Sequence, residues 1–203
     1  MNNRVPLALP EWADDDGAKV IQNKETRKIG WIGLGKTGHN LAFQLIRAGY
    51  DVTVYDKDKT KAYDLMKFGA KIANDANSVA SESDYLFLCV GNIKNLSNLM
   101  ENEDYGIYDD IKTGSIVINH SPRDPDFEHD EKIFLKSKHA TLLDAPIHFG
   151  DGSTHEMKKE LQVGGVESEY NHVEPLLQLY ATKLRYFGDV EVCANDDFPC
   201  DIE

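Results

Sequence analysis

A glycine-rich turn between a strand-like and a helix-like segment constrains this fold more than any other feature of the chain. The run Ile29-Gly-Trp-Ile-Gly-Leu-Gly-Lys-Thr-Gly38 has GxGxxG spacing. In a dinucleotide-binding turn, the first glycine permits the tight bend, the second lets a pyrophosphate approach the backbone, and the third permits close helix packing. We therefore expect the N–H groups at the helix start to face phosphates. The residues expected to bind the dinucleotide are Gly33, Leu34, Gly35, Lys36, Thr37 and Gly38.

The segments on either side of the turn favour the same interpretation. Residues 39–48 carry apolar side chains at helical spacing and stop before Gly49, a typical helix terminator. A second strand-like run, 52–55, ends in Asp56, about 20 residues beyond the glycines. An acidic side chain at this place can accept hydrogen bonds from the adenosine ribose hydroxyls. A phosphate-binding turn or a purely structural turn is the alternative interpretation.

Charge and cysteine content narrow the classes of partner. The 203-residue chain has a formal net charge of −13, whereas nucleic acids and anionic membranes both require a basic face. We expect neither as a partner, and no apolar run approaches the length of a membrane span. Cys89, Cys193 and Cys200 match no zinc or disulfide framework. The cysteines therefore favour a reducing compartment and a cytoplasmic location.

The chain divides into a central domain and two tails. Residues 1–27 contain two prolines and an acidic run and lack the apolar core of a secretory signal, so we predict a flexible N-terminal tail. Trp12 in this tail could anchor a protein partner or fold back on the domain. Residues 28–188 form the predicted domain. Residues 189–203 contain six acidic and no basic side chains and are predicted to be an acidic tail.

Strand-like and helix-like segments alternate through the central domain. Strands are predicted near 28–33, 51–55, 70–72, 84–90, 115–119, 140–144, 160–164 and 183–187, with helices near 37–48, 58–68, 76–81, 93–101, 122–138 and 166–180. This order predicts an α/β fold: a Rossmann-type, doubly wound, mainly parallel sheet covered by helices on both faces. Ligands of such sheets lie beyond the carboxyl ends of the strands. The site is therefore expected at loops 33–38, 56–59, 91–92, 120–123 and 146–152.

Five motifs follow one another in a characteristic order. They are Gly30-Trp-Ile-Gly-Leu-Gly-Lys-Thr-Gly38, Cys89-Val-Gly-Asn92, Ile118-Asn-His-Ser121, Leu143-Asp-Ala-Pro146 and Val163-Gly-Gly165. In order and spacing they resemble the 3-hydroxyacid dehydrogenase family, which includes 3-hydroxyisobutyrate dehydrogenases and tartronate semialdehyde reductases and is related to 6-phosphogluconate dehydrogenase. The resemblance covers about residues 28–190. It implies an NAD(P)-binding Rossmann-type domain in which Val90, Gly91, Asn92 and Ser121 also contact the cofactor.

The chain departs from this family at the catalytic lysine. In family members an all-helical C-terminal domain follows and begins with a helix carrying a lysine, which acts as general acid/base on the substrate hydroxyl. That position falls at about Asp197, and a carboxylate cannot replace a cation beside a developing alkoxide. We therefore expect the Rossmann-type domain without the family's C-terminal helical domain, and loss of autonomous hydride transfer. The alternative is an active NAD(P)-dependent oxidoreductase of small 3-hydroxy acids, completed by a partner chain or part of a longer enzyme.

The substrate loop departs from the family as well. The family reads Asp-Ala-Pro-Val-Ser-Gly-Gly where this chain reads Asp144-Ala-Pro-Ile-His-Phe-Gly150, and Phe149, Ser153 and Met157 stand at glycine positions of the pattern. Bulky side chains there would block or reshape the pocket. No catalytic residue is therefore assigned.

Two residues are candidates for catalysis. Ser121 matches the family's substrate-contacting serine, although Pro122 replaces the threonine expected after it. His148, with His120 on a neighbouring loop, could transfer protons because histidine titrates near neutral pH. The competing interpretation is that both histidines bond to backbone or solvent. These histidines and Asp144 lack metal-ligand spacing, so no metal is expected.

The cofactor and a protein partner can also be predicted. Asp56 would repel a 2′-phosphate, which favours NAD, whereas Lys57 occupies the position where NADP-binding relatives have arginine. NAD is therefore expected, with NADP as the alternative. Without a helical domain, the final helix is expected to expose apolar side chains to a protein partner: Val173, Leu176, Leu177 and Leu179.

Overall fold

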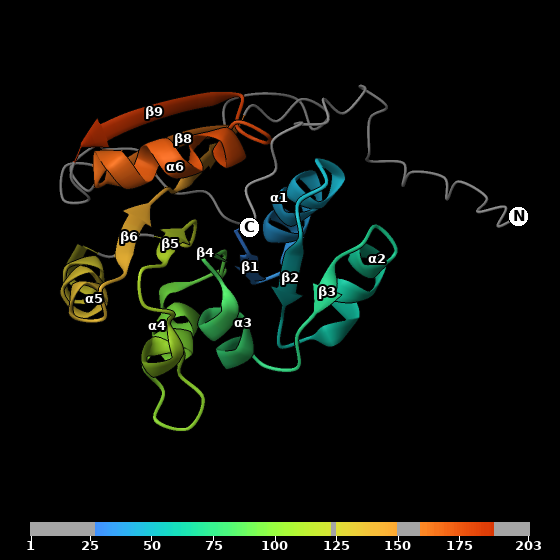
Figure 1. Cartoon of the computed structure of the whole chain (residues 1–203), viewed down its shortest axis with the longest axis horizontal. Coiled ribbons are helices and arrows are strands. Elements are labelled where there is room, and N and C mark those ends of the chain that lie inside the picture. Colours follow the sequence, from blue (N-terminus) through green and yellow to red (C-terminus); the bar gives the residue numbers. More distant parts are fainter. Residues whose placement is uncertain (1–26, 123–124, 150–158, 189–203) are drawn as a thin grey trace, which may run out of the picture.

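The computed structural model describes residues 27–122, 125–149 and 159–188 of the chain. Within these ranges a single sheet has the strand order β3-β2-β1-β4-β5-β6-β8-β7, with β9 paired to β8. The strands are β1 (Ile29–Ile32), β2 (Val52–Tyr55), β3 (Lys71–Ile72), β4 (Tyr85–Leu88), β5 (Ile116–Asn119), β6 (Thr141–Asp144), β7 (Ile147–Phe149), β8 (Lys159–Gly165) and β9 (Lys183–Gly188). Figure 1 shows helices packed on both sides of this sheet.

The first six strands pair in parallel with one another, and β9 also pairs in parallel with β8. Strand β1 pairs in parallel with both β2 and β4, and β5 and β6 continue the ladder in the same direction. Strands β1, β4 and β5 are buried along their whole length, as expected when helices cover both faces. Strand β8 runs antiparallel to β6 and β7. The prediction of a Rossmann-type, mainly parallel sheet is confirmed.

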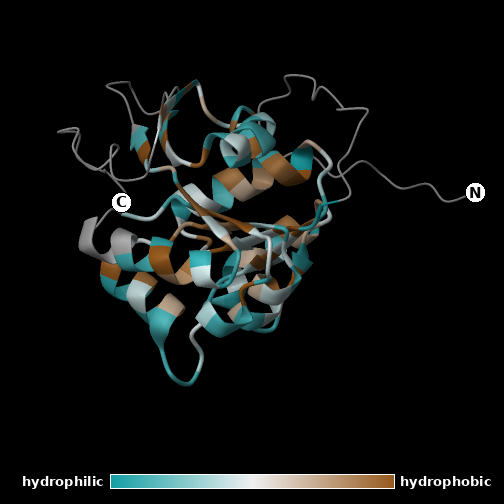
Figure 2. Ribbon diagram, turned by 60° about the vertical axis from the view of Figure 1, so that its left-hand side comes forward, coloured by the Kyte–Doolittle hydropathy of each residue, from teal (hydrophilic) through white to brown (hydrophobic). Residues whose placement is uncertain are grey.

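The helices lie in two layers. They are α1 (Lys36–Arg47), α2 (Tyr63–Met66), α3 (Ala76–Glu82), α4 (Ile93–Glu101), α5 (Pro125–Ser137) and α6 (Glu167–Leu177), with 3-10 turns η1 (Lys59–Ala62) and η2 (Tyr108–Asp110). One core joins α1 and α6 to the sheet around Trp31 and Phe87, and a second joins α3, α4 and α5 around Ile32 and Leu88. Adjacent strand residues thus serve opposite faces. In Figure 2 the hydrophobic segments gather along the strands and on the helix sides that face them.

Short polar side chains and glycines set where several helices begin and end. Asp75 accepts a hydrogen bond from the Ser78 N–H at the start of α3, and Asn92 accepts one from the Asn95 N–H at the start of α4. Such caps satisfy N–H groups that have no partner within the helix. After α1, Gly49 adopts a φ of 86° and its N–H bonds to the Ile46 carbonyl, which ends the helix.

The structure corrects the prediction for the final helix. Val173 and Leu177 are fully buried, Leu176 is nearly so, and Leu179 is partly buried against the same core. The reason is that α6 turns its apolar side toward the sheet, where these residues complete the α1-side core. The expected exposed apolar surface is therefore wrong for this helix.

Two smaller differences concern local structure. The predicted helix over 58–68 is divided into η1 and α2, with Asp58 bonding to Thr60 at the start of η1. The segment 147–149, expected to lie in a loop, forms β7 against β8. The predicted tails and the substitutions at Ser153, Met157 and Asp197 lie outside the described residues. Across the described ranges no helix is both long and apolar enough to cross a membrane.

Candidate functional site

The three glycines of the turn have different surroundings. Gly33 has a φ of 99°, and a Cβ there would lie 2.2 Å from the Cys89 carbonyl oxygen. A Cβ on Gly38 would lie 2.2 Å from the Gly33 carbonyl oxygen, so the first turn of α1 packs directly on the strand ends. A Cβ on Gly35 would meet no atom of the described residues within 4 Å. Two glycines thus serve packing, and the middle one faces open space where a ligand can approach the backbone.

The start of α1 suits an anion. Gly35 is the N-cap residue and makes no side-chain cap, and the first turn contains no acidic residue. The N–H groups of a helix start and the positive end of its dipole attract negative charge. The residues present therefore fit a pyrophosphate at this point.

Asp56 holds the glycine turn from the end of β2. Its Oδ2 accepts a hydrogen bond of 2.7 Å from the Leu34 N–H, and its Oδ1 accepts one of 2.9 Å from the Asp58 N–H. Lys61 Nζ lies 3.4 Å from the same Oδ1. Asp56 is only 8% exposed, and it also lines a pocket over the glycine turn. The carboxylate therefore both orients the turn and borders the ligand space.

A pocket of about 790 Å³ opens over the turn. Most of the predicted cofactor residues line it: Gly33, Gly35, Lys36, Thr37, Gly38, Asp56, Lys57, Val90 and Gly91. Lys61 joins Lys36 and Lys57 there, so three lysines face two acids, Asp56 and Asp75, in the pocket wall of an acidic protein. This local cationic excess suits a ligand with negative charge.

Three predicted cofactor residues do not line this pocket directly. Leu34 is buried and contributes its N–H to Asp56, and Asn92 caps α4. The Ser121 hydroxyl accepts a 3.0 Å hydrogen bond from the Val90 N–H, and its own N–H donates to Asn119 Oδ1. Ser121 is fully buried. It therefore fixes the loop after β4 from the end of β5.

Sequence reasoning missed the part of the pocket formed by α3 and α4. The residues missed there are Asp75, Ala76, Asn77, Asn95, Asn98 and Leu99, with Tyr105 in the loop after α4. Four lining residues from other elements were also outside the predicted cofactor set: Ile32, Tyr55, Lys61 and Cys89. One signal was present, because Asp75 and Asn77 follow a predicted parallel strand at the same sheet edge as the glycine turn.

The two histidine candidates lie in different settings. His120 is fully buried, with Nδ1 at 2.6 Å from the Ala145 carbonyl oxygen and Nε2 at 2.8 Å from the Tyr180 hydroxyl. Burial lowers the pKa of His120 to about 4, although the Ala145 hydrogen bond opposes this shift. His120 is thus a neutral core residue that ties the turn after α6 to the sheet. His148 lies in β7 opposite Glu160 and is partly buried.

Two further observations limit the chemistry near these strand ends. Burial raises the pKa of the Cys89 thiol to about 12, so this pocket-lining cysteine stays protonated near neutral pH. In the part of the chain that the structure describes, no group of three or more His, Cys, Asp or Glu side chains could hold a metal ion.

Together, the parallel sheet, the open middle glycine and the acid after β2 define a dinucleotide-binding domain of the Rossmann type. Residues 28–188 match the family model described as the NAD binding domain of 6-phosphogluconate dehydrogenase, and the chain belongs to this family of NAD-binding domains.

The chain is also similar to named relatives. It is 30% identical over 161 residues to the probable 3-hydroxyisobutyrate dehydrogenase-like 1, mitochondrial, of Arabidopsis thaliana, covering 79% of this chain and 48% of that protein. It is 28% identical over 183 residues to the probable mitochondrial 3-hydroxyisobutyrate dehydrogenase of Dictyostelium discoideum, covering 87% of this chain and 57% of that protein. The chain thus spans about half the length of these relatives.

A solved structure of the 3-hydroxyisobutyrate dehydrogenase of Mycobacterium tuberculosis with L-serine has the same fold. The comparison with this chain gives a TM-score of 0.72 at 20% sequence identity, and it covers 82% of this chain and 56% of the M. tuberculosis chain. An imine reductase from Pseudomonas sp. gives a TM-score of 0.71 at 21% identity, over 83% and 57% of the two chains.

Proposed function

We propose that this chain binds NAD at the glycine turn and that, by itself, it does not catalyse hydride transfer. The observation that carries the binding proposal is the open space at Gly35, above an uncapped helix start and beside a buried carboxylate. Gly35 to Gly38 would hold the pyrophosphate, Asp56 the adenosine ribose, and the Val90–Gly91 loop the nicotinamide half. When bound, the nicotinamide ring can accept or donate a hydride.

The preference for NAD over NADP is part of the proposal. Asp56 is almost completely buried at the pocket wall, and its negative charge opposes a 2′-phosphate. Lys57 and Lys61 in the same wall reduce this repulsion. We therefore expect NAD to bind more tightly, with measurable binding of NADP.

Loss of autonomous catalysis is supported by the sequence. Asp197 stands at about the position of the family's lysine, and a carboxylate cannot take the cationic role beside a developing alkoxide. The second candidate function is an active oxidoreductase of small 3-hydroxy acids, completed by a partner chain or a longer polypeptide. The observation that favours it is Ser121, retained at the carboxyl end of β5 with its hydroxyl on the loop after β4.

Turnover by the purified chain separates the two candidate functions. The chain is incubated with NAD and a panel of small 3-hydroxy acids, and NADH formation is followed by absorbance. The proposal predicts no turnover above that of a Gly35→Val control. Turnover that disappears in this control would show that the chain itself catalyses hydride transfer.

Other parts of the proposal concern partners and location. Because the apolar side of α6 is buried, it is not proposed as a surface for a protein partner. The tails, including Trp12, remain the predicted place for such a partner. A cytoplasmic location stays a prediction from the cysteine content.

A further inference from the structure

The pocket has two chemically different ends. The end at the glycine turn carries Lys36, Lys57 and Lys61, whereas none of the described residues that line the end between α3 and α4 is a lysine. Its side chains are mainly neutral and polar: Asn77, Asn95, Asn98 and Tyr105, with Leu99 and Ala76 as apolar neighbours. Asp75 is the acid at this end, and its carboxylate is engaged by the Ser78 N–H and hydroxyl. An anion therefore fits one end and a neutral heterocycle fits the other.

Asn95 and Asn98 differ from the other asparagine at this end. Asn77 Nδ2 donates to the Gly106 carbonyl at 3.0 Å and to Asp110 Oδ2 at 2.7 Å, so its amide nitrogen is used within the fold. Within the described residues, the side-chain amides of Asn95 and Asn98 make no hydrogen bond. The two lie three positions apart on α4 and therefore on one side of that helix, with Leu99 beside them. Each amide keeps a donor and an acceptor for a ligand.

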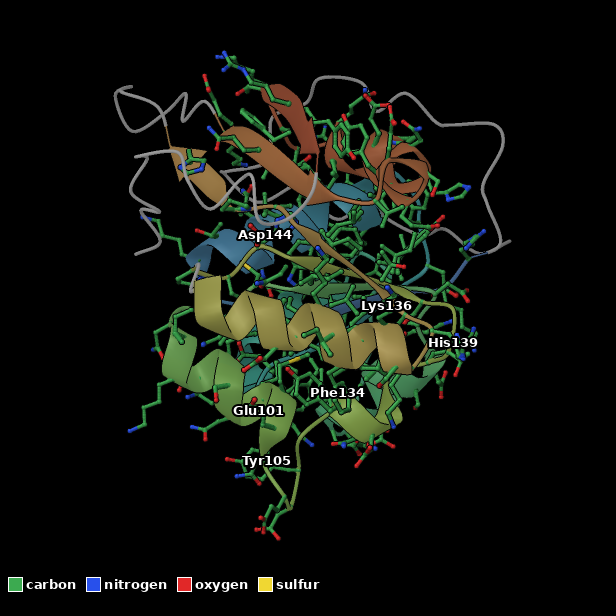
Figure 3. The ribbon with its side chains drawn as sticks, turned by 90° about the vertical axis from the view of Figure 1, so that its left-hand side faces the viewer. Glu101, Tyr105, Phe134, Lys136, His139 and Asp144 are labelled. Carbon is green, nitrogen blue, oxygen red and sulfur yellow. The ribbon has the colours of Figure 1, made fainter. Side chains whose placement is uncertain are left out.

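Tyr105 is held at the rim of the same end by a well-connected loop. Asn102 Oδ1 accepts hydrogen bonds from the Asp104 and Tyr105 N–H groups, and the Gly106 N–H bonds to the Asn102 carbonyl at 2.7 Å. The Asn77 bond to Gly106 joins this loop to α3. Tyr105 is nevertheless 54% exposed. Figure 3 shows it in the outlying loop that continues from Glu101, far from Asp144.

We propose that Asn95 and Asn98 read the hydrogen-bonding edge of the adenine base and that Tyr105 covers its face. This inference rests on the proposed dinucleotide function and assigns the base-recognition residues. An asparagine amide can pair with the adenine amino group and an adjacent ring nitrogen at once. A tyrosine ring stacks on any base and distinguishes bases little. Edge recognition and stacking should therefore be separable by mutation.

The test compares NAD with nicotinamide 1,N6-ethenoadenine dinucleotide by isothermal titration. The etheno bridge removes the amino donor and the N1 acceptor and leaves the phosphates, riboses and nicotinamide unchanged. We expect the wild-type chain to bind NAD about tenfold more tightly, since each lost hydrogen bond accounts for about two- to tenfold. The Asn95→Ala/Asn98→Ala variant should bind the two dinucleotides within about twofold of each other.

Two further variants complete the design. Tyr105→Ala should weaken both dinucleotides by a similar factor, on the order of tenfold, and leave their ratio unchanged. Ser97→Ala is the matched control, because Ser97 is on α4, does not line the pocket and bonds to Glu101. Its affinities should equal those of the wild type. Equal thermal melting of all variants confirms that the fold is intact.

The outcomes distinguish the two proposals. A wild-type preference for NAD that persists in the double asparagine variant would overturn the assignment of base recognition, and so would the absence of any preference in the wild type. A wild-type chain that binds neither dinucleotide nor NADH would overturn the proposed function itself.

Discussion

Substitution of the three turn glycines should separate folding from binding. Among the residues that the structure describes, none has an atom within 4 Å of a methyl group placed on Gly35, and the residue has a φ of −61°, which alanine adopts without strain. Gly35→Ala should therefore change the free energy of unfolding by no more than about 1 kcal/mol, since the cap and entropy effects of this change are of that size and opposite sign. The methyl group would project into the space proposed for the pyrophosphate.

The other two substitutions should act mainly on stability. Gly33→Ala places a Cβ 2.2 Å from the Cys89 carbonyl at a φ of 99°. Strain of about 1–3 kcal/mol and overpacking of about 1–3 kcal/mol predict a loss of about 2–6 kcal/mol. Gly38→Ala, with a contact of 2.2 Å to the Gly33 carbonyl, should lose about 1–3 kcal/mol.

Urea denaturation and isothermal titration with NADH measure the two effects. Displacing one charge-assisted hydrogen bond from the pyrophosphate removes about 1.5–3 kcal/mol, so Gly35→Ala should weaken NADH binding by about 10- to 150-fold. The reasoning would be refuted if Gly35→Ala bound NADH as tightly as the wild type, or if it destabilised the fold as much as Gly33→Ala.

Three other predictions follow from the site. Asp56→Ala should weaken NADH binding by about tenfold and NADPH binding less, because it removes the acceptor for Leu34 and the charge that opposes a 2′-phosphate; titration with both dinucleotides measures the ratio, and an unchanged ratio contradicts it. Ser121→Ala leaves the Val90 N–H without its acceptor and should lower the free energy of unfolding by about 1–3 kcal/mol in urea; a neutral effect would contradict the role assigned to the hydroxyl. The pKa of His120 is about 4 in the folded protein, whereas the ordinary value of 6.5 applies to the unfolded chain. Between these two pH values only the unfolded state therefore takes up the proton. Stability should therefore fall by up to about 3 kcal/mol as the pH drops from 6.5 to 4, and His120→Gln should flatten this part of the profile.

The elements of the fold could be predicted because their signals are local. A few consecutive residues are enough to predict the glycine turn and the three buried apolar strands β1, β4 and β5. Strand β7 was missed because it has only three residues and directly follows Pro146. It forms by pairing with β8, which is separated from it in sequence, so no local pattern predicts it. The single predicted helix over 58–68 was wrong because Asp58 bonds to Thr60 and starts a 3-10 turn there.

The site was less accessible to sequence reasoning because its parts meet only in three dimensions. The glycine turn and Asp56 were found from their spacing, and the structure brings them together in one pocket. The amides of Asn95 and Asn98 could not be recognised, since a polar helix position in sequence does not show what it faces. Leu177 was predicted to be exposed but is buried. The sequence shows that one face of the helix is apolar, but it does not show which part of the protein packs against that face.

The most direct test of this account is isothermal titration of the purified chain with NADH and, separately, NADPH. Saturable NADH binding in the micromolar range, with weaker NADPH binding, is the predicted result. No heat of binding with either dinucleotide, from a chain shown to be folded, would contradict the central claim that this pocket is a working dinucleotide site.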